Sequence, residues 1–391
     1  MVYRATDGLI VWAILITKKV NGLLFPCLSR QKSIHYRARQ VIQTLPVDLV
    51  LPSSDGQTNG GIMEFKPLGC SGLKISSIGL GTVTFGREIN EDASWRILDH
   101  ALENGISWLD TAEAYGGGNA RVYRRNALGV EDVREESGEL GSSELIIGRW
   151  LKARGCRDRV TLCTKVSSGN RPENIDRALT VSLERLQVDR VDIYKLHSPD
   201  ANTPIAESLG ALAAHVTAGR IGVIGCSNFS QAQLQEAVEA SHRHKYPRFE
   251  VVQPPYSLAA PSVQTDLLPY CHREKIAVTS FSPLGAGFLS GKYTPDRNAF
   301  PERSRFHVIP AHADIYFNER NFKLVERLRE KSDQLGVPMV RLAMAWVMTH
   351  PDVTSVIVGA RTTSHLDNAF EARAMNLDSV LRAEMTGWLT D

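Results

Sequence analysis

From Phe65 onward, short runs of apolar and β-branched residues alternate with longer stretches in which apolar residues recur every three or four positions. The first pattern is typical of buried strands, and the second is typical of helices that place one face on a core. The eight candidate strands are residues 75–80, 106–110, 160–165, 191–197, 221–226, 250–253, 276–281 and 354–358. Their regular alternation with helices predicts an α/β protein built from βα units around a parallel sheet.

The intervening stretches carry the apolar stripes of amphipathic helices. Ile175, Leu179 and Leu183 recur at intervals of four and form one such stripe. Ser230 is followed three residues later by Gln233, which is the spacing of a capping box and predicts that a helix begins there. We interpret the stripes as surfaces that face the core, with no functional role.

Eight strands joined by helices favour a closed (β/α)8 TIM barrel over an open, doubly wound sheet. An open sheet that binds a dinucleotide carries a GxGxxG turn after its first strand. Here Gly79 and Gly81 are followed by Gly86, so this spacing is not met. A barrel gathers its chemistry at the carboxyl ends of its strands, and we therefore look for unusual polar residues there.

Composition narrows the class of partner. The 391 residues are 43% hydrophobic and 23% charged, which is typical of a globular protein with a sizeable core. Lys and Arg number 45 against 43 Asp and Glu, so no strong field favours nucleic acid or an anionic membrane, and a small-molecule substrate is expected. The six cysteines form no CxxC pair, which fits reduced thiols in the cytoplasm. The apolar run at residues 9–16 is far shorter than the roughly twenty residues that span a bilayer.

The amino-terminal part of the chain differs from the rest. Basic residues face a single acid, Asp7, before Pro46, and residues 52–61 (PSSDGQTNGG) have the composition of a linker. We expect residues 1–61 to be an extension, either disordered or wrongly assigned to the coding sequence, with a targeting segment as the alternative. The barrel domain is expected over residues 62–391.

Four polar side chains follow three consecutive candidate strands. Asp110 ends the strand at 106–110, and Tyr115 lies shortly after it; Lys165 ends the strand at 160–165 and His197 ends that at 191–197. Each residue alone is a weak signal, because a lysine at a strand end is more often solvated and a lone histidine more often structural. Since the strand ends of a barrel meet at one rim, we expect an acid, a phenol, an amine and an imidazole to converge there.

These four groups suit proton transfer beside a hydride. Reduction of a carbonyl builds negative charge on its oxygen, so the site needs a proton donor and dipoles that favour the alkoxide. Tyr115 can donate this proton, although a free phenol has a pKa of about 10. We expect Lys165 to lower the pKa of the phenol, Asp110 to hold Lys165 charged and in place, and His197 to orient the carbonyl or share its proton.

Three segments, WLDTAEAYGGG, TLCTKV and KLHSPD, resemble the catalytic segments of the aldo-keto reductase superfamily. The resemblance extends from about residue 65 to about residue 372. It implies a TIM-barrel oxidoreductase that uses NADP(H) to reduce an aldehyde or ketone, or to oxidise an alcohol or sugar. It also implies Tyr115 as general acid or base, Lys165 and Asp110 as the pair that tunes it, and His197 as the residue that orients the substrate.

The resemblance further implies a nicotinamide site in the second half of the chain. It assigns the carboxamide to Ser227 and Asn228 in GCSNF and to Gln253 in VVQPPYSL, and it assigns stacking on the ring to Tyr256. The segment SPLGAG, with a lysine downstream, resembles the part that wraps the pyrophosphate. Its candidate residues are Ser282, Pro283, Leu284, Gly287 and Lys292.

The sequence VGAR at residues 358–361 resembles the start of the helix that holds the adenosine 2′-phosphate. Arg361 offers a planar fork suited to phosphate. His365 stands where the family commonly has Gln or Arg, and Ala369 stands where it usually has Asn, with Asn368 beside it. We expect NADP(H) as cofactor, with NAD as the alternative, and no metal ion. The candidate contacts are Gly359, Arg361, Ser364, His365 and Asn368.

Two features leave alternatives open. Residues 118–142 lengthen the loop after Tyr115 with alternating charges, which favours a solvated lid or a subunit contact. The chain ends soon after the last barrel helix, so we expect a comparatively open substrate pocket.

A regulatory barrel that binds NADP(H) and a protein partner but turns over little substrate is the main alternative function. Metal-dependent hydrolysis by His197 and Asp110 is a weaker one, because a metal site needs several ligands in defined geometry.

Overall fold

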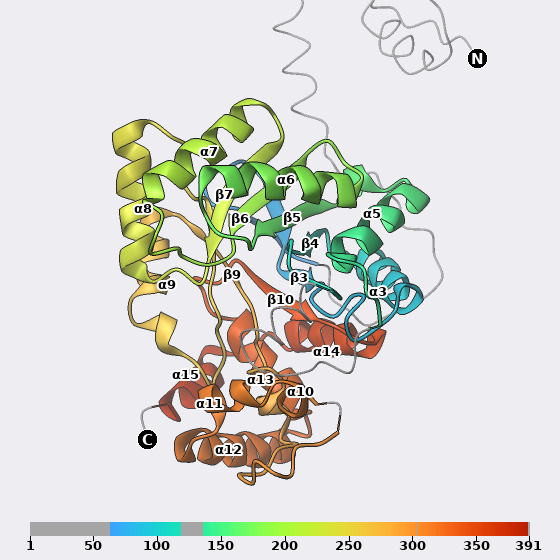
Figure 1. Ribbon diagram of the computed structural model, residues 1–391. Coiled ribbons are helices and arrows are strands. Elements are labelled where there is room, and N and C mark those ends of the chain that lie inside the picture. Colours follow the sequence, from blue (N-terminus) through green and yellow to red (C-terminus); the bar gives the residue numbers. More distant parts are fainter. Residues whose placement is uncertain (1–62, 119–135, 303, 390–391) are drawn as a thin grey trace, which may run out of the picture. The chain divides into compact units, whose positions relative to one another are not determined.

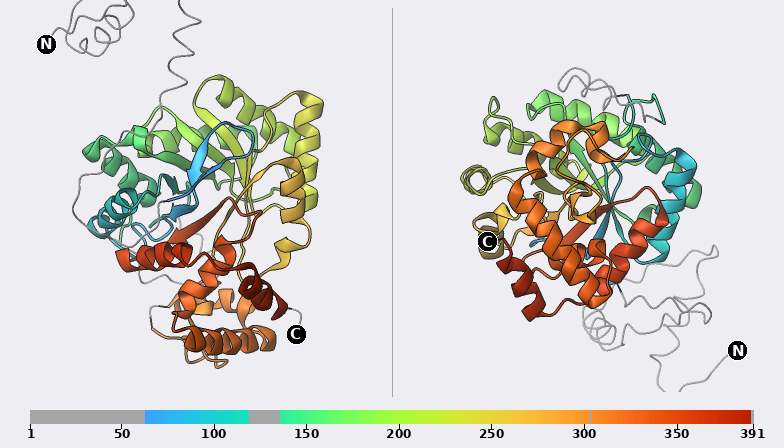
Figure 2. Two further views of the ribbon diagram at one scale, coloured as in Figure 1. Left: turned by 180° about the vertical axis from the view of Figure 1, so that it is seen from behind. Right: turned by 90° about the horizontal axis from the view of Figure 1, so that it is seen from below.

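A computed structural model describes residues 63–118, 136–302 and 304–389 of the chain (Figure 1). Eight parallel strands form a closed barrel in the order β10-β3-β4-β5-β6-β7-β8-β9, and helices surround it (Figure 2). The expected (β/α)8 fold is therefore confirmed, and every candidate strand overlaps a barrel strand. The barrel strands are β3 (Ile78–Gly81), β4 (Trp108–Asp110), β5 (Thr161–Val166), β6 (Val191–Leu196), β7 (Ile221–Ser227), β8 (Val251–Gln253), β9 (Ala277–Ser280) and β10 (Ser355–Gly359).

Two expectations fall on residues that the structure does not describe. The extension proposed for residues 1–61 lies outside the described ranges. Most of the charged loop at residues 118–142 also lies outside them, because the described chain stops at Gly118 and resumes at Glu136. The extension, the lid and the subunit contact therefore stay predictions.

Strand pairing determines which side chains face the interior of the barrel. In the parallel pairing of β5 with β6, Lys165 lies opposite Lys195 and Cys163 lies opposite Ile193. Because successive residues of a strand point to opposite faces, Cys163 and Lys165 share one face of β5, and Ile193 and Lys195 share one face of β6. Cys163 and Ile193 belong to the cluster of buried residues inside the barrel. Two lysines are therefore directed into the interior at the same level.

The first candidate strand, residues 75–80, consists of two strands. β2 (Lys74–Ser76) pairs antiparallel with β1 (Phe65–Pro67), and β3 begins after Ser77. Apolar residues on both sides of the two serines, Ile75 before them and Ile78 and Leu80 after them, hide the break. Leu68 and Ile75 pack inside the barrel with Trp108 and Val251, so the β1–β2 hairpin closes the amino end of the barrel.

The helices bury their apolar stripes as predicted. Ile175, Leu179 and Leu183 are buried, and the capping box is present, with the Ser230 hydroxyl accepting from the backbone N–H of Gln233. None of the helices in the described ranges is long and apolar enough to cross a membrane. The helices that alternate with the strands are α3 (Glu91–Glu103), α5 (Ser142–Arg154), α6 (Pro172–Leu186), α7 (Ile205–Thr217), α8 (Gln231–His244), α9 (Leu267–Glu274), α13 (Met339–Met348) and α14 (Thr363–Ala374), and α15 (Ser379–Gly387) follows.

A long connection between β9 and α13 lies at one end of the barrel (Figure 1). It contains α10 (Arg305–Val308), α11 (Ala313–Tyr316) and α12 (Glu319–Leu335). Aromatic side chains hold it together: the ring centroids of Tyr293 and Phe306 are 4.5 Å apart, and those of Phe306 and Phe317 are 5.2 Å apart. This packed connection gives the loop that follows β9 a rigid support.

Candidate active site

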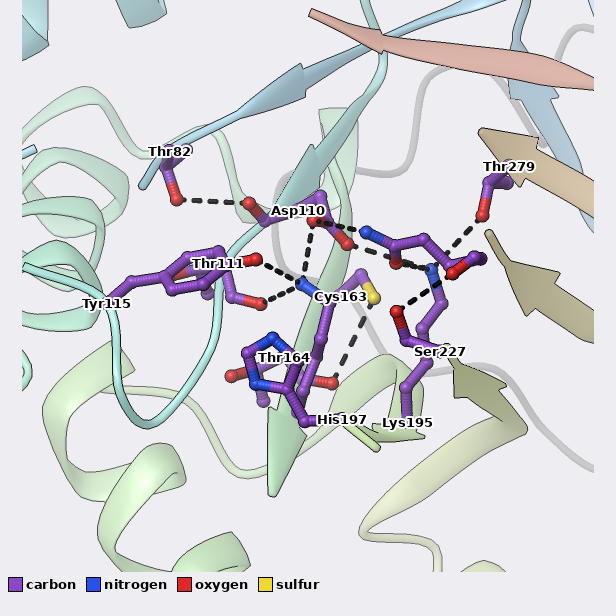
Figure 3. Close-up of polar contacts among 12 residues, drawn as sticks. Thr82, Asp110, Thr111, Tyr115, Cys163, Thr164, Lys195, His197, Ser227 and Thr279 are labelled. Atoms are coloured by element: carbon purple, nitrogen blue, oxygen red, sulfur yellow. Dashed lines mark hydrogen bonds and ion pairs between the residues drawn. The ribbon is translucent and has the colours of Figure 1, made fainter. Parts of the chain in front are cut away.

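The carboxyl ends of β4, β5 and β6 bring together the four side chains that the sequence assigned to catalysis. Figure 3 labels three of them, Asp110, Tyr115 and His197. Asp110 is the last residue of β4, Lys165 lies near the end of β5, and His197 directly follows β6. Tyr115 reaches the same place from the loop after β4, where the backbone N–H of Glu113 donates to the carbonyl of Lys165 at 3.1 Å. Asp110 is 1% exposed and Lys165 is 0% exposed, so this pair is shielded from water.

Lys165 connects the members of this group. Its Nζ donates to Oδ2 of Asp110 at 2.7 Å, to the carbonyl of Thr111 at 2.7 Å and to the hydroxyl of Tyr115 at 3.4 Å. The same nitrogen lies 4.7 Å from the centre of the Tyr115 ring. Since all three N–H donors of the ammonium group have acceptors, its position beside the phenol oxygen is fixed.

Each member of the Asp110–Lys165 pair stabilises the charged form of the other. Burial alone would raise the pKa of Asp110, but the ammonium groups of Lys165 and Lys195 outweigh burial and lower this pKa below its usual range. Burial likewise disfavours the charged form of Lys165, yet the carboxylate of Asp110 outweighs it and raises the pKa of Lys165. Both groups therefore stay charged around neutral pH.

The phenol of Tyr115 differs from the sequence-based expectation. Burial raises the pKa of Tyr115, and the opposing effect of Lys165 does not cancel it. The carboxylate of Asp110 adds to the rise. The expected lowering is therefore wrong as a net effect, although the direction assigned to Lys165 is correct. The hydroxyl is held in its protonated form, from which it can donate.

His197 lies beside Tyr115, with the two rings edge to face and their centroids 5.5 Å apart. Its Nδ1 is 2.6 Å from the hydroxyl of Ser167, and Nδ2 of Asn228 donates to its carbonyl at 2.9 Å. Burial, followed by the positive charge of Lys165, lowers the pKa of His197 to about 3. The imidazole is therefore neutral, and because Nδ1 is engaged by Ser167, Nε2 is the atom that can meet a substrate oxygen.

The three residues assigned to a nicotinamide carboxamide lie together at the ends of β7 and β8. The hydroxyl of Ser227 donates to the backbone carbonyl of Gln253 at 2.9 Å, and the backbone N–H of Asn228 donates to the same carbonyl at 3.1 Å. Asn228 has a φ of 62°, a left-handed conformation that asparagine tolerates. The side chain of Gln253 is buried, and its Nε2 donates to Oδ2 of Asp110 at 3.1 Å. Gln253 thus joins this group to the Asp110–Lys165 pair.

The structure contradicts the assignment of Tyr256 to ring stacking. Tyr256 is 1% exposed, and its ring lies 5.1 Å from the ring of Trp346 and 5.7 Å from that of His350. Its hydroxyl donates to Oε1 of Gln264 at 2.7 Å. A ring enclosed in this way has no open face for a cofactor, so Tyr256 is a core residue.

Phe281 is the aromatic side chain at the mouth that the sequence reasoning missed. It directly follows β9. Ala277, four residues before it, lies inside the barrel. The alternation of a strand places Phe281 on the same face, and it packs against the inner cluster while staying partly exposed. The period of two within residues 276–281 was the signal that could have identified it.

The segment that resembles a pyrophosphate loop follows directly. Ser282, Ala286 and Gly287 have φ values of 56°, 57° and 90°, so the loop winds through several left-handed turns. In a loop of this kind, successive peptide N–H groups point toward the same side of the loop, where they can bind an anion. The predicted residues on this loop are Ser282, Pro283, Leu284, Gly287 and Lys292.

Positive charges gather where the sequence predicts a 2′-phosphate. Burial, followed by the charges of Arg361 and Arg305, lowers the pKa of Lys292, and burial followed by Arg361 and Lys292 lowers the pKa of His365. The carboxylate of Glu88 lies 3.3 Å from Nη2 of Arg305 and 3.8 Å from Nη1 of Arg361. Cations that repel one another in this way favour a bound anion with several negative oxygens.

Of the other residues predicted for this site, Gly359 and Ser364 lie near the start of α14, whereas the side chain of Asn368 is engaged by other residues. Gly359 ends β10, and the hydroxyl of Ser364 lies 2.8 Å from that of Thr362 in the first turn of α14. Asn368 is directed elsewhere: its Nδ2 donates to the carbonyl of Ser364 at 2.8 Å, and its Oδ1 accepts from Nε of Arg341 at 2.9 Å. The amide of Asn368 therefore ties α14 to α13.

Two cations of the region were also missed. Arg305 lies on the short helix α10, which no periodic pattern indicates, and only the folding of the connection after β9 brings it to the Glu88 carboxylate near Arg361. Lys195 lies on β6, two residues before His197, and is 0% exposed. A lysine on the inward face of a strand whose neighbours are apolar was a visible signal.

The fold and the site together define a (β/α)8 enzyme with acid–base groups at the mouth of its barrel. A family model described as "Aldo/keto reductase family" matches residues 77–386, and the chain belongs to this family of oxidoreductases. The resemblance seen in the sequence is thereby confirmed.

Similar proteins cover most of the chain. It is 31% identical over 330 residues to "Uncharacterized oxidoreductase YrpG" of Bacillus subtilis (strain 168), which covers 81% of this chain and 93% of that protein. It is 32% identical over 329 residues to "Probable voltage-gated potassium channel subunit beta" of Arabidopsis thaliana, covering 79% and 91%. It is 28% identical over 310 residues to "Aldo-keto reductase yakc [NADP(+)]" of Schizosaccharomyces pombe, covering 76% and 82%.

Proposed function

We propose that this chain is an NADP(H)-dependent oxidoreductase that reduces an aldehyde or ketone, or oxidises an alcohol or sugar, with Tyr115 as general acid or base. The observation that carries the proposal is the 3.4 Å contact between the Tyr115 hydroxyl and Nζ of Lys165, which Asp110 holds at 2.7 Å. A fixed ammonium group beside a phenol oxygen stabilises the negative charge that develops there when the proton leaves. The name of the Schizosaccharomyces pombe relative, which specifies NADP(+), supports NADP as cofactor.

The donor set around the mouth suits a dinucleotide phosphate. Lys292, Arg305 and Arg361 offer three cations to phosphate oxygens, and the left-handed loop at residues 282–287 offers peptide N–H groups. Phe281 offers a partly exposed aromatic face in place of Tyr256. When bound, the cofactor would supply or accept the hydride. The carboxamide of its nicotinamide would be held by Ser227, Asn228 and Gln253.

The protein's own residues would handle the substrate and the proton. Tyr115 and His197 lie edge to face, so a carbonyl oxygen between them can contact the phenol hydroxyl and Nε2 of the imidazole. In the reducing direction the Tyr115 hydroxyl gives its proton to the carbonyl oxygen, and Lys165 stabilises the phenolate that remains. His197, neutral and held by Ser167, orients the carbonyl by a hydrogen bond.

Tyr115→Phe tests this assignment. The variant lacks the transferable proton, and we expect its kcat with a simple aldehyde to fall by about two to four orders of magnitude. Its Kd for NADPH should stay within about twofold of the wild-type value, because the hydroxyl meets the substrate and not the phosphates. Tyr246→Phe, on the loop after α8, is the matched control. Full activity of Tyr115→Phe refutes the proton-donor role.

A second function draws on the names of two relatives. The Arabidopsis thaliana protein and one from Oryza sativa subsp. japonica are both called "Probable voltage-gated potassium channel subunit beta". A barrel that binds NADP(H) and acts through a protein partner is therefore the alternative. Purified protein with NADPH and a panel of aldehydes and sugars separates the two functions. Steady loss of NADPH absorbance supports the enzyme, and tight binding without consumption supports the regulatory barrel.

Metal-dependent hydrolysis has no comparable support. Within the part of the chain that the structure describes, no three His, Cys, Asp or Glu side chains come together as a metal ion would require.

We further propose that the protein works in the cytoplasm, where thiols stay reduced, because the five cysteines in the described ranges are all free.

A further inference from the structure

Lys195 is a second buried lysine at the base of the candidate active site, and the proposed chemistry gives it no task. It lies on β6 directly opposite Lys165 on β5, and its side chain is 0% exposed. Lysine is almost never fully buried unless it is paired, because the charged group loses its hydration. A burial cost of this kind calls for a reason other than packing.

The ammonium group of Lys195 connects the acid of the site to the carboxamide-binding residue. Its Nζ donates to Oε1 of Gln253 at 2.7 Å and to the hydroxyl of Thr279 at 3.3 Å, and it lies 3.6 Å from Oδ1 of Asp110 (Figure 3). Gln253 completes the link, because its Nε2 donates to the other oxygen of Asp110 at 3.1 Å. Two ammonium groups and one amide therefore surround a single carboxylate.

These partners allow one orientation of the Gln253 amide. An ammonium group can only donate, so it requires the amide oxygen on its side. An ionised carboxylate can only accept, so Asp110 requires the amide nitrogen on its side. If the amide were flipped, a donor would face Lys195 and an acceptor would face Asp110. Lys195 and Asp110 together thus lock the amide, and it keeps one N–H and one lone pair for a further partner.

We propose that Lys195 is a positioning residue: by locking the Gln253 amide, it presents a fixed donor and a fixed acceptor to the carboxamide of the nicotinamide. The inference rests on the proposed function. It requires that Lys195 acts on cofactor binding through Gln253, and that its charge acts separately on the acid–base groups. Burial and the charge of Lys165 lower the pKa of His197, and the positive charge of Lys195 lowers it further. Burial raises the pKa of Asp110, and the charges of Lys165 and then Lys195 lower it.

A double-mutant cycle on NADPH binding tests the first requirement. Lys195→Met removes both the donor and the charge at similar length, and we expect the Kd for NADPH, measured by its fluorescence, to rise about tenfold. Gln253→Leu should cause a similar rise. In the double variant, Lys195→Met should add less than about twofold to the effect of Gln253→Leu, because the amide on which it acts is gone. Lys152→Met, on the exposed face of α5, is the matched control. A full tenfold effect of Lys195→Met in the Gln253→Leu protein overturns the proposal.

A second variant separates the hydrogen bond from the charge and tests the proposal by itself if Lys195→Met does not fold. Lys195→Gln keeps an N–H donor for Oε1 of Gln253 but carries no charge. We expect its Kd for NADPH to stay within about threefold of wild type, whereas the acid limb of its pH–kcat profile moves to higher pH, because one of the cations that oppose protonation of His197 is gone. A tenfold loss of affinity, or an unchanged pH profile, counts against the inference.

The wild-type protein distinguishes this failure from failure of the proposed function. Wild type that neither binds nor consumes NADPH removes the proposed function and this inference with it. Wild type that binds and consumes NADPH, together with Lys195→Met that does so equally well, removes this inference alone.

Discussion

Nζ of Lys165 lies 2.7 Å from Oδ2 of Asp110 inside the barrel, where neither side chain contacts bulk water. The same carboxylate also faces Lys195, whose Nζ is 3.6 Å from Oδ1. The charges are therefore unequal: one carboxylate compensates two ammonium groups. This inequality means that loss of the acid and loss of either base have different consequences.

Asp110→Asn is expected to destabilise the fold more than Lys165→Met does. Without the carboxylate, two buried ammonium groups face each other uncompensated, and removal of one partner of a buried pair costs about 3–5 kcal/mol. Without Lys165, the carboxylate keeps Lys195 and the amide of Gln253 as partners. Urea unfolding followed by circular dichroism measures both free energies. An equal or larger loss for Lys165→Met would contradict this assignment of charges.

The two directions of the reaction should differ at alkaline pH. Alcohol oxidation needs the Tyr115 phenolate as base, and burial raises the pKa of this phenol above its ordinary value of 10.0. We therefore expect the rate of oxidation to keep rising through pH 10, while carbonyl reduction, which needs the phenol, stays flat up to that pH. Lys165→Met should raise the pKa of Tyr115 further and lower the oxidation rate at any given pH. Initial rates in both directions across pH 7 to 11 check this; an oxidation plateau near neutral pH would exclude it.

Arg361→Ala is expected to change cofactor preference. A charge-assisted hydrogen bond to the 2′-phosphate contributes about 1.5–3 kcal/mol, so the Kd for NADPH should rise about tenfold to a hundredfold. The Kd for NADH, which lacks this phosphate, should change less than about twofold. Arg243→Ala on α8 is a control of the same charge. Equal losses for the two cofactors would place the 2′-phosphate elsewhere.

His197 makes the fold sensitive to acid. Its pKa is about 3 in the folded chain, against 6.5 for an ordinary histidine. Between these values the unfolded chain takes up a proton at this residue and the folded chain does not, so stability falls as pH drops from 6.5 toward 3; above 6.5 the residue contributes no pH dependence. His197→Asn should therefore show a shallower loss of unfolding free energy between pH 7 and 5 than wild type, with His244→Asn as control. Parallel curves for wild type and His197→Asn would mean that the imidazole is not buried in its neutral form.

The barrel and the acid–base group could be predicted because both follow from strand ends. Alternating apolar runs indicated the eight strands, and a barrel brings the residues after its strands to one rim, so Asp110, Lys165 and His197 had to meet. Tyr115 lies close enough along the chain to reach the same rim. What the sequence did not reveal was the depth of burial, and burial decides the direction in which the pKa of Tyr115 moves.

The errors concern contacts between distant parts of the chain. Tyr256 follows β8 as expected, but Trp346 of α13 covers its ring, and no local pattern reports which helix will pack on a loop. Arg305 lies near the same Glu88 carboxylate as Arg361 only because the connection after β9, which an aromatic cluster holds together, brings α10 there. The break at Ser77 escaped notice because Ile75 and Ile78 on either side of the two serines are both apolar, although they pack in different clusters: Ile75 inside the barrel and Ile78 in the larger core cluster.

The hairpin of β1 and β2 closes one end of the barrel, and this affects which substitutions lower stability without lowering activity. Leu68 and Ile75 seal the end of the barrel farthest from the reacting groups. Trimming either side chain would loosen the scaffold and lower its melting temperature while the acid–base geometry above stays intact. Residues that set the melting temperature and residues that carry out the reaction thus lie at opposite ends of the barrel, so stabilising substitutions at the hairpin end can leave the reaction unchanged.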